Sequence, residues 1–192
     1  MKAILISIQP YWVFLIIAKT MGWNIDKEKT VEVRKNYPKS NDWNKVVKIY
    51  CSKDKKSFAK VPKEYQSFME KFLGKVIGEF ICDELTGGFW ISPFSDYLQR
   101  QSCLSYDEVC DYANGKPIFA WHISNLVIYD KPRELSEFSA YTKNKCPAYL
   151  NGVCLDRTQN DVIHCENLDC PHKRITRPPQ SWMYCESEVD TE

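Results

Sequence analysis

The sequence predicts an α+β protein followed by a short cysteine-rich extension. Several short runs alternate apolar and polar residues or are continuously apolar, as strands are, whereas few stretches repeat apolar residues at helical spacing. Beyond residue 138 the character changes, and four cysteines fall within 25 residues. We therefore expect a main domain over residues 1–138 and an extension over residues 139–192.

The chain begins with a predicted buried strand and a predicted buried helix. Residues 4–8 are apolar apart from one serine, and Pro10 suits the first turn of a helix over residues 11–21. Lys2 before an apolar stretch is also typical of a signal peptide, but Gln9 and Pro10 interrupt the stretch and no small-residue cleavage site follows. The apolar run is too short to span a bilayer.

The next predicted strand, residues 29–35, holds the first candidate site. Two valines alternate there with Thr30, Glu32 and Arg34, so the period of two places the valines on one face and the polar side chains on the other. With Lys29 at its start, this strand combines groups that can hold a phosphate, a base edge or a small polar substrate. The alternative is a solvated edge strand whose charges oppose aggregation.

The rest of the main domain continues with strands and amphipathic helices. A helix over residues 64–73 carries aromatic residues at spacings of three and four. Another helix begins with a capping box between Ser105 and Glu108 and stops at Asn114-Gly115. The remaining strands are predicted over residues 46–51, 75–85 and 117–129, the second of them ending at Gly87-Gly88.

Charge is distributed unevenly along the chain. Residues 1–75 carry 16 Lys and Arg against 7 Asp and Glu, although the net charge of all 192 residues is only +1. The richest stretch is residues 52–63, a basic loop or short helix. A basic half favours a polyanionic partner, nucleic acid ahead of a membrane, but solvated lysine-rich loops give the same composition. The 44% of hydrophobic residues excludes wholesale disorder.

The order of residues in the 29–35 strand resembles a known family. Lys29 and Thr30 are followed by Glu32 and Arg34 at alternate positions, and this pattern is similar to that of the ASCH domain, of the PUA-like superfamily. The sequence departs from the family just before the pattern. Residues 20–28 are longer than the usual glycine-containing turn, which alters the rim of the expected cleft.

Three further stretches resemble the ASCH family in the same order. Residues 3–12 resemble its opening strand and helix start, residues 75–84 its hydrophobic-acidic strand, and residues 119–130 its closing strand. The resemblance covers residues 1–138. It implies a β-barrel with helices packed on the outside.

The resemblance also implies a ligand and a set of residues around the cleft. RNA or a modified nucleotide is the expected ligand, in a protein of the cytoplasm. Phosphate contacts give affinity and base contacts give selectivity. The cations are therefore expected to contact the phosphate backbone of the ligand, and Glu32 and His122 to contact a base edge. The candidate binding residues are Lys29, Thr30, Glu32, Arg34, Lys35, Tyr11, Trp12 and His122.

An enzyme is the alternative function. One small ASCH-like enzyme deacetylates N4-acetylcytidine with a lysine, a threonine and a glutamate, and ribonuclease activity is also known in the family. The lysine matches Lys29, but the threonine position holds Glu32, so that nucleophile is missing. An amidohydrolase or a ribonuclease acting on nucleosides or RNA would use Lys29, Glu32 and His122 as acid-base candidates. The second alternative is a protein-interaction module.

The cysteines indicate a reducing compartment and a metal. Nine cysteines, an odd number spread through both regions, do not form the pattern of a secreted disulfide framework. The extension is too short to build its own core, and thiolates suit zinc, so we predict a structural zinc site; disulfides and ordinary reduced cysteines are the alternatives. A strand over residues 181–185 would return to the main domain. The expected ligands are Cys146, Cys154, Cys165 and Cys170, with His164 and His172 as alternates.

Overall fold

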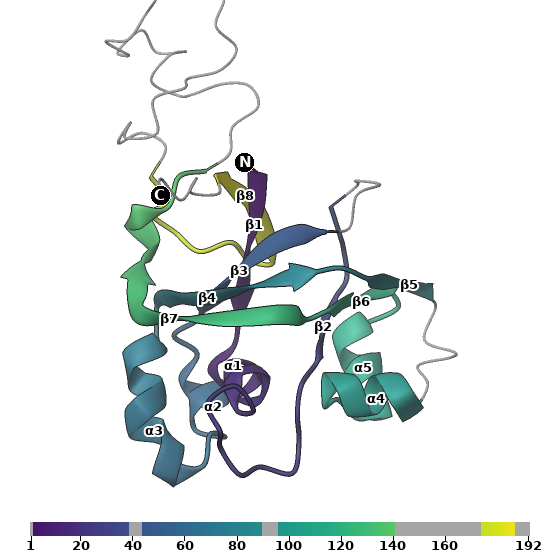
Figure 1. Ribbon diagram of the computed structural model, residues 1–192. Coiled ribbons are helices and arrows are strands. Elements are labelled where there is room, and N and C mark those ends of the chain that lie inside the picture. Colours follow the sequence, from purple (N-terminus) through teal and green to yellow (C-terminus); the bar gives the residue numbers. More distant parts are fainter. Residues whose placement is uncertain (1, 39–43, 90–95, 141–173, 187–192) are drawn as a thin grey trace, which may run out of the picture.

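The chain forms two β-sheets with helices packed against them (Figure 1). The computed structural model describes residues 2–38, 44–89, 96–140 and 174–186. The mixed α+β class agrees with the sequence prediction. The strands are β1 (Lys2–Ile8), β2 (Val31–Arg34), β3 (Lys45–Cys51), β4 (Lys75–Cys82), β5 (Leu85–Phe89), β6 (Ile118–His122), β7 (Ser124–Glu134) and β8 (Trp182–Glu186).

The helices are short and follow mostly local signals. The predicted capping box of Ser105 and Glu108 is present, and Asn114 in the left-handed conformation ends that helix. One helix, α4, has no counterpart among the predicted elements because Leu98 is its single aliphatic residue. None of the described helices has the length and apolar character that a membrane crossing requires. The helices are α1 (Pro10–Ile17), α2 (Lys55–Phe58), α3 (Lys63–Met69), α4 (Asp96–Ser102), α5 (Tyr106–Ala113) and the 3-10 turns η1 (Glu70–Phe72) and η2 (Leu135–Glu137).

The larger sheet has the strand order β7-β4-β3-β1-β8. β1 runs parallel to β3, and the other neighbours pair antiparallel. Both faces of β1 are covered: Ile4 and Ile6 join the main core with α1, whereas Ala3 and Leu5 join a second core that includes Phe138. Burial on both sides explains why this strand is apolar almost throughout.

The smaller sheet has the strand order β2-β6-β5, and the candidate strand, β2, lies at its edge. Val31 and Val33 pack against Val109 of α5, which confirms their predicted burial. The opposite face of β2 is also covered, because Glu32 and Arg34 are buried as well. The alternative of a solvated edge strand is therefore wrong.

At two of its crossings between the sheets, the chain passes almost directly from one strand into the next. β4 ends at Cys82 in the larger sheet and the chain continues as β5 in the smaller one, while β6 returns to the larger sheet as β7. At this return the amide of Ile123 donates to the carbonyl of Thr30 at 2.9 Å. The single strands predicted over residues 75–85 and 117–129 are therefore two strands each, because pairing partners change at the crossings.

The two glycines of β5 allow this strand to pair closely with β6, and they do not end the strand. Gly87 and Gly88 lie within β5, so the predicted strand end at this pair is wrong. A Cβ atom at Gly87 would come within 2.6 Å of the carbonyl oxygen of Ile118 on β6. Glycine at this position thus allows the two strands to approach.

The described residues do not close into the expected barrel. β2 pairs with β6 alone, and the amide of Thr30 before it donates to the carbonyl of Gln101 in α4 at 2.9 Å. Side chains of Arg34 and Asn36, rather than ladder hydrogen bonds, connect the β2 region to β1 and β8. The hydrogen bonds of the β2 region on this side are thus made with α4 and through side chains, not with a strand that would close the barrel.

Candidate functional site

Three charged side chains of the candidate strand meet in the interior. The carboxylate of Glu32 lies between two cations: Oε1 is 3.0 Å from Nη2 of Arg34, and Oε2 is 3.4 Å from Nζ of Lys29. The side chains of Lys29, Glu32 and Arg34 are only 2%, 8% and 9% exposed. We call these three residues the buried charge cluster.

Backbone carbonyls from two other elements hold the buried charge cluster in place. Lys29 donates from Nζ to the carbonyl of Ser102 at 2.9 Å, at the end of α4. Arg34 donates from Nη2 to the carbonyl of Ser7 at 2.6 Å, near the end of β1. The cluster therefore connects β2 to α4 beside the smaller sheet and to β1 of the larger sheet.

The charges of the cluster do not cancel. Two cations share one carboxylate, so the site is positive when all three groups are ionised. Burial lowers the pKa of Lys29 below its ordinary 10.5, and the neighbouring Glu32 opposes this shift only in part. The amine of Lys29 thus loses its proton more readily than that of an exposed lysine.

Two N–H donors beside the cluster are buried and without a hydrogen-bond partner among the described residues. They are Nε of Arg34 and Nε1 of Trp121. Trp121 lies directly opposite Glu32 in the β2–β6 pairing, so its side chain shares the face of the charge cluster. Buried donors are rarely left unpaired, because each costs free energy until an acceptor meets it. The described residues supply no acceptor for either of these two donors.

Aromatic rings flank the cluster at the start of α1. The centroid of the Trp12 ring lies 5.2 Å from Nζ of Lys29, and the Tyr11 ring lies 5.1 Å from that of Trp12. Both rings also pack against the main core and are only half-buried. Their remaining exposed surface offers flat apolar faces next to a cation.

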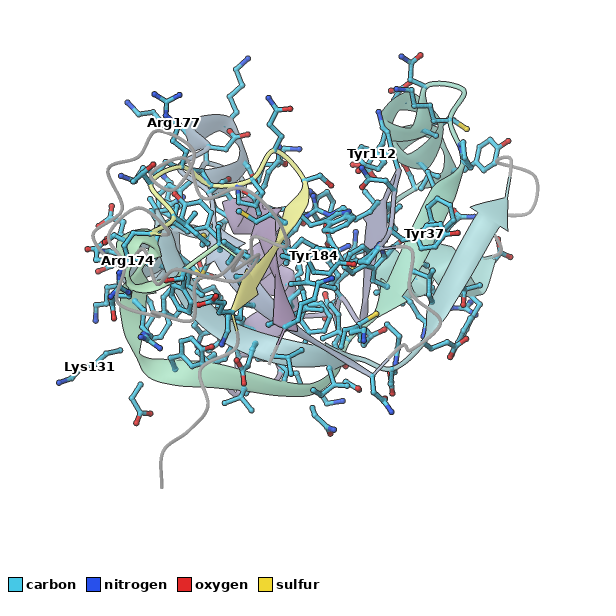
Figure 2. The ribbon with its side chains drawn as sticks, turned by 90° about the horizontal axis from the view of Figure 1, so that it is seen from above. Tyr37, Tyr112, Lys131, Arg174, Arg177 and Tyr184 are labelled. Atoms are coloured by element: carbon cyan, nitrogen blue, oxygen red, sulfur yellow. The ribbon has the colours of Figure 1, made fainter. Side chains whose placement is uncertain are left out.

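Two other candidates do not join the cluster. Nζ of Lys35 lies 4.8 Å from the ring of Tyr112 on α5, on the side of the molecule that holds the smaller sheet (Figure 2). Lys35 follows the two valines in phase, which explains why it points to their face. Thr30 is half-buried, and its backbone groups bond Gln101 and Ile123.

His122 lies at the crossing between the sheets. It pairs with Val31 in the β2–β6 register, so its side chain lies on the face opposite the charge cluster. Its Nδ1 is 2.7 Å from Oδ1 of Asp83, and this hydrogen bond lowers the pKa of the Asp83 carboxyl. The structure thus joins His122 to the β4–β5 turn and not to Glu32.

The predicted zinc ligands cannot be placed in this description. Cys146, Cys154, Cys165 and Cys170, with their alternates His164 and His172, lie outside the described residues. Within the described part of the chain, no group of three metal-ligating side chains comes together. The zinc site remains a prediction.

Solved structures of ASCH proteins are similar to this chain. A serine-to-alanine mutant of ZmASCH from Zymomonas mobilis matches with a TM-score of 0.53 and 16% identity, over 96% of this chain and 88% of that one. The structure titled ASCH from Zymomonas mobilis matches with a TM-score of 0.51 and 17% identity, over 96% and 87%. The fold is ASCH-like. No family model and no curated protein matches the sequence significantly.

Within the ASCH-like fold, the sequence prediction named the buried charge cluster and the two rings beside it, Tyr11 and Trp12. It named Lys29, Glu32 and Arg34, which the structure brings together. The unpartnered indole N–H of Trp121 depends on pairing between distant strands, which the sequence does not show. The sequence prediction also did not name Asp83, whose link to His122 spans 39 residues of sequence. No local signal marks either contact.

Proposed function

We propose that this protein binds RNA or a modified nucleotide and that the buried charge cluster recognises a base. The observation that carries the proposal is the pair of buried, unpartnered donors, Nε of Arg34 and Nε1 of Trp121. Base edges present carbonyl oxygens and ring nitrogens that such donors can meet. The similarity of the fold to ASCH proteins supports the same class of ligand.

Burial favours a base over the phosphate backbone at this site. The Arg34 side chain is 9% exposed and the Lys29 side chain 2% exposed, so a passing phosphate would reach little of either. A single-stranded base can stack on an aromatic side chain and present its edge to hydrogen-bond donors. Arg34 and Trp121 would then donate to its edge, Glu32 would orient Arg34, and Trp12 would stack beside it.

A conservative substitution tests the proposal. Arg34→Lys keeps the positive charge but removes Nε and the forked geometry, so we expect single-stranded RNA to bind about tenfold more weakly, or ~1.4 kcal/mol. The matched control is Lys35→Gln, which removes a cation one residue away on the opposite face. Fluorescence titration of tetranucleotides with each variant measures both effects.

Two results would contradict base recognition at this cluster. One is an affinity of Arg34→Lys equal to that of the wild type. The other is an equal loss in Arg34→Lys and Lys35→Gln, which would reduce the interaction to general charge. Absence of RNA binding by the wild type at low salt would reject the function as a whole.

An enzyme acting on nucleosides or RNA is the second candidate, and one observation favours it. Burial lowers the pKa of Lys29, which favours the neutral amine that a general base or a nucleophile requires. Product formation from acylated cytidine and from RNA, in wild type and in Lys29→Met, decides this. Unchanged turnover in Lys29→Met would remove the cluster as an active site.

A further inference from the structure

A run of exposed lysines surrounds the short helix α2. All five lysines between residues 53 and 63 are exposed, and none forms an ion pair within the described part of the chain. The single acidic residue in the run, Asp54, is already engaged, since its carboxylate accepts from the amides of Lys56 and Ser57 and from Gln9. These residues, which we call the α2 lysine surface, are Lys53, Lys55, Lys56, Lys60 and Lys63.

The packing of α2 fixes which side chains face water. Ser57 is buried and accepts a hydrogen bond from the amide of Tyr11 at 3.1 Å, and Phe58 packs against the main core. Lys55 and Lys56, on the other side of the same turn, are left outward. Lys53 is positioned separately, because its Cε lies over Gly74, where a Cβ atom would come within 2.1 Å of it.

Residues 7–11 are hydrogen-bonded both to the segment that carries the α2 lysine surface and to the buried charge cluster. On one side of this segment, the amide of Ser52 donates to the carbonyl of Ile8 at 2.8 Å, and Gln9 donates to Asp54 at 3.2 Å. On the other side, Arg34 donates to the carbonyl of Ser7 at 2.6 Å. Helices α1 and α2 lie side by side in Figure 1. At the start of α1, the amide of Tyr11 donates to Ser57 of α2, and the ring of Trp12 lies 5.2 Å from Nζ of Lys29.

We propose that the α2 lysine surface binds the phosphate backbone of single-stranded RNA whose base enters the buried charge cluster. The inference rests on the proposed function and adds to it the length of RNA that the protein contacts. A cluster as buried as this one supplies selectivity but few phosphate contacts, whereas unpaired exposed lysines supply affinity. The half-exposed Tyr11 and Trp12 rings then stack bases between the two ends. The bound RNA therefore extends several nucleotides beyond the recognised base.

The length of the RNA separates this inference from base recognition. Wild type should bind a dodecanucleotide more tightly than a tetranucleotide, and Lys55→Gln/Lys56→Gln should bind the tetranucleotide as before while losing about tenfold on the dodecanucleotide. Its slope of log affinity against log salt should fall in magnitude by about 1.4, because each phosphate contact on a single strand adds roughly 0.7. Lys53 is left unchanged because it packs on Gly74.

The matched control removes the same charge elsewhere. Lys116→Gln/Lys131→Gln changes two exposed lysines without ion pairs among the described residues. Lys131 belongs to β7 and extends away from the body (Figure 2). The control should keep the wild-type affinity for both RNA lengths and the wild-type salt slope.

Each other outcome overturns a defined part of the reasoning. Equal binding of both lengths by the wild type would overturn the α2 lysine surface and leave base recognition standing. Equal losses in the test and control variants would overturn it too, because the effect would then be net charge alone. Binding of neither length would reject RNA binding itself. Lysine-dependent binding to phosphatidylserine vesicles without RNA binding would assign the surface to a membrane instead.

Discussion

Removing the carboxylate of Glu32 should destabilise the protein severely. Glu32 lies 3.0 Å from Arg34 and 3.4 Å from Lys29, and both cations are at least nine-tenths buried. At an effective dielectric constant of 20, each pair is worth about 5 kcal/mol before desolvation is subtracted. Glu32→Gln would leave two buried cations beside a neutral amide. We therefore expect a loss of about 3–5 kcal/mol in the free energy of unfolding.

Urea and thermal unfolding followed by circular dichroism measure this loss. For a chain of this length, the expected fall in Tm is about 6–20 °C. Glu28→Gln is the matched control, because Glu28 pairs with Lys19 at 3.2 Å on the surface and should cost at most about 1 kcal/mol. Adding Lys29→Met to Glu32→Gln should restore part of the stability. A Glu32→Gln variant as stable as Glu28→Gln would refute the reasoning.

Three further predictions concern other groups. Burial lowers the pKa of Lys29, so between the folded pKa and the unfolded value of about 10.4 the unfolded chain keeps a proton that the folded chain has lost. As pH rises through this window, the wild type should therefore gain stability relative to Lys29→Met. Urea unfolding of both proteins across alkaline pH measures this gain. Asn36→Ala should cost about 0.5–1.5 kcal/mol and increase proteolysis of residues 174–186, because Oδ1 of Asn36 accepts from Nε1 of Trp182 at 2.9 Å. Elemental analysis should find about one zinc per chain, and chelation should expose residues 140–175 to protease while residues 1–138 stay protected.

Local features of the fold were predictable from the sequence, and the pairing of distant strands was not. The capping box between Ser105 and Glu108 lies within one helical turn, so four residues carry the whole signal. The division of residues 75–85 into β4 and β5 depends instead on which strands lie beside each half. β4 pairs with β3 and β7, whereas β5 pairs with β6. No property of the apolar run itself records that change of partner.

The candidate strand shows the same division between local and distant information. Its alternation correctly separates Val31 and Val33 from Glu32 and Arg34. The alternation cannot tell whether the polar face meets water, because that depends on α1, β1 and α4 coming to cover it. His122 was likewise predicted to share a base edge with Glu32. The register opposes Glu32 to Trp121, which puts His122 on the other side.

The two separate sheets explain why a residue that we propose for recognition, Arg34, also holds the fold together. In a closed barrel, a neighbouring strand would satisfy the carbonyl of Ser7, but here Nη2 of Arg34 does so at 2.6 Å. That bond and the ion pair to Glu32 fix the guanidinium and leave Nε directed at neither group. Complete truncation of Arg34 would therefore remove a structural bond and a ligand contact together. Arg34→Lys retains the charge beside Glu32, so an affinity loss that exceeds its stability loss reports on recognition.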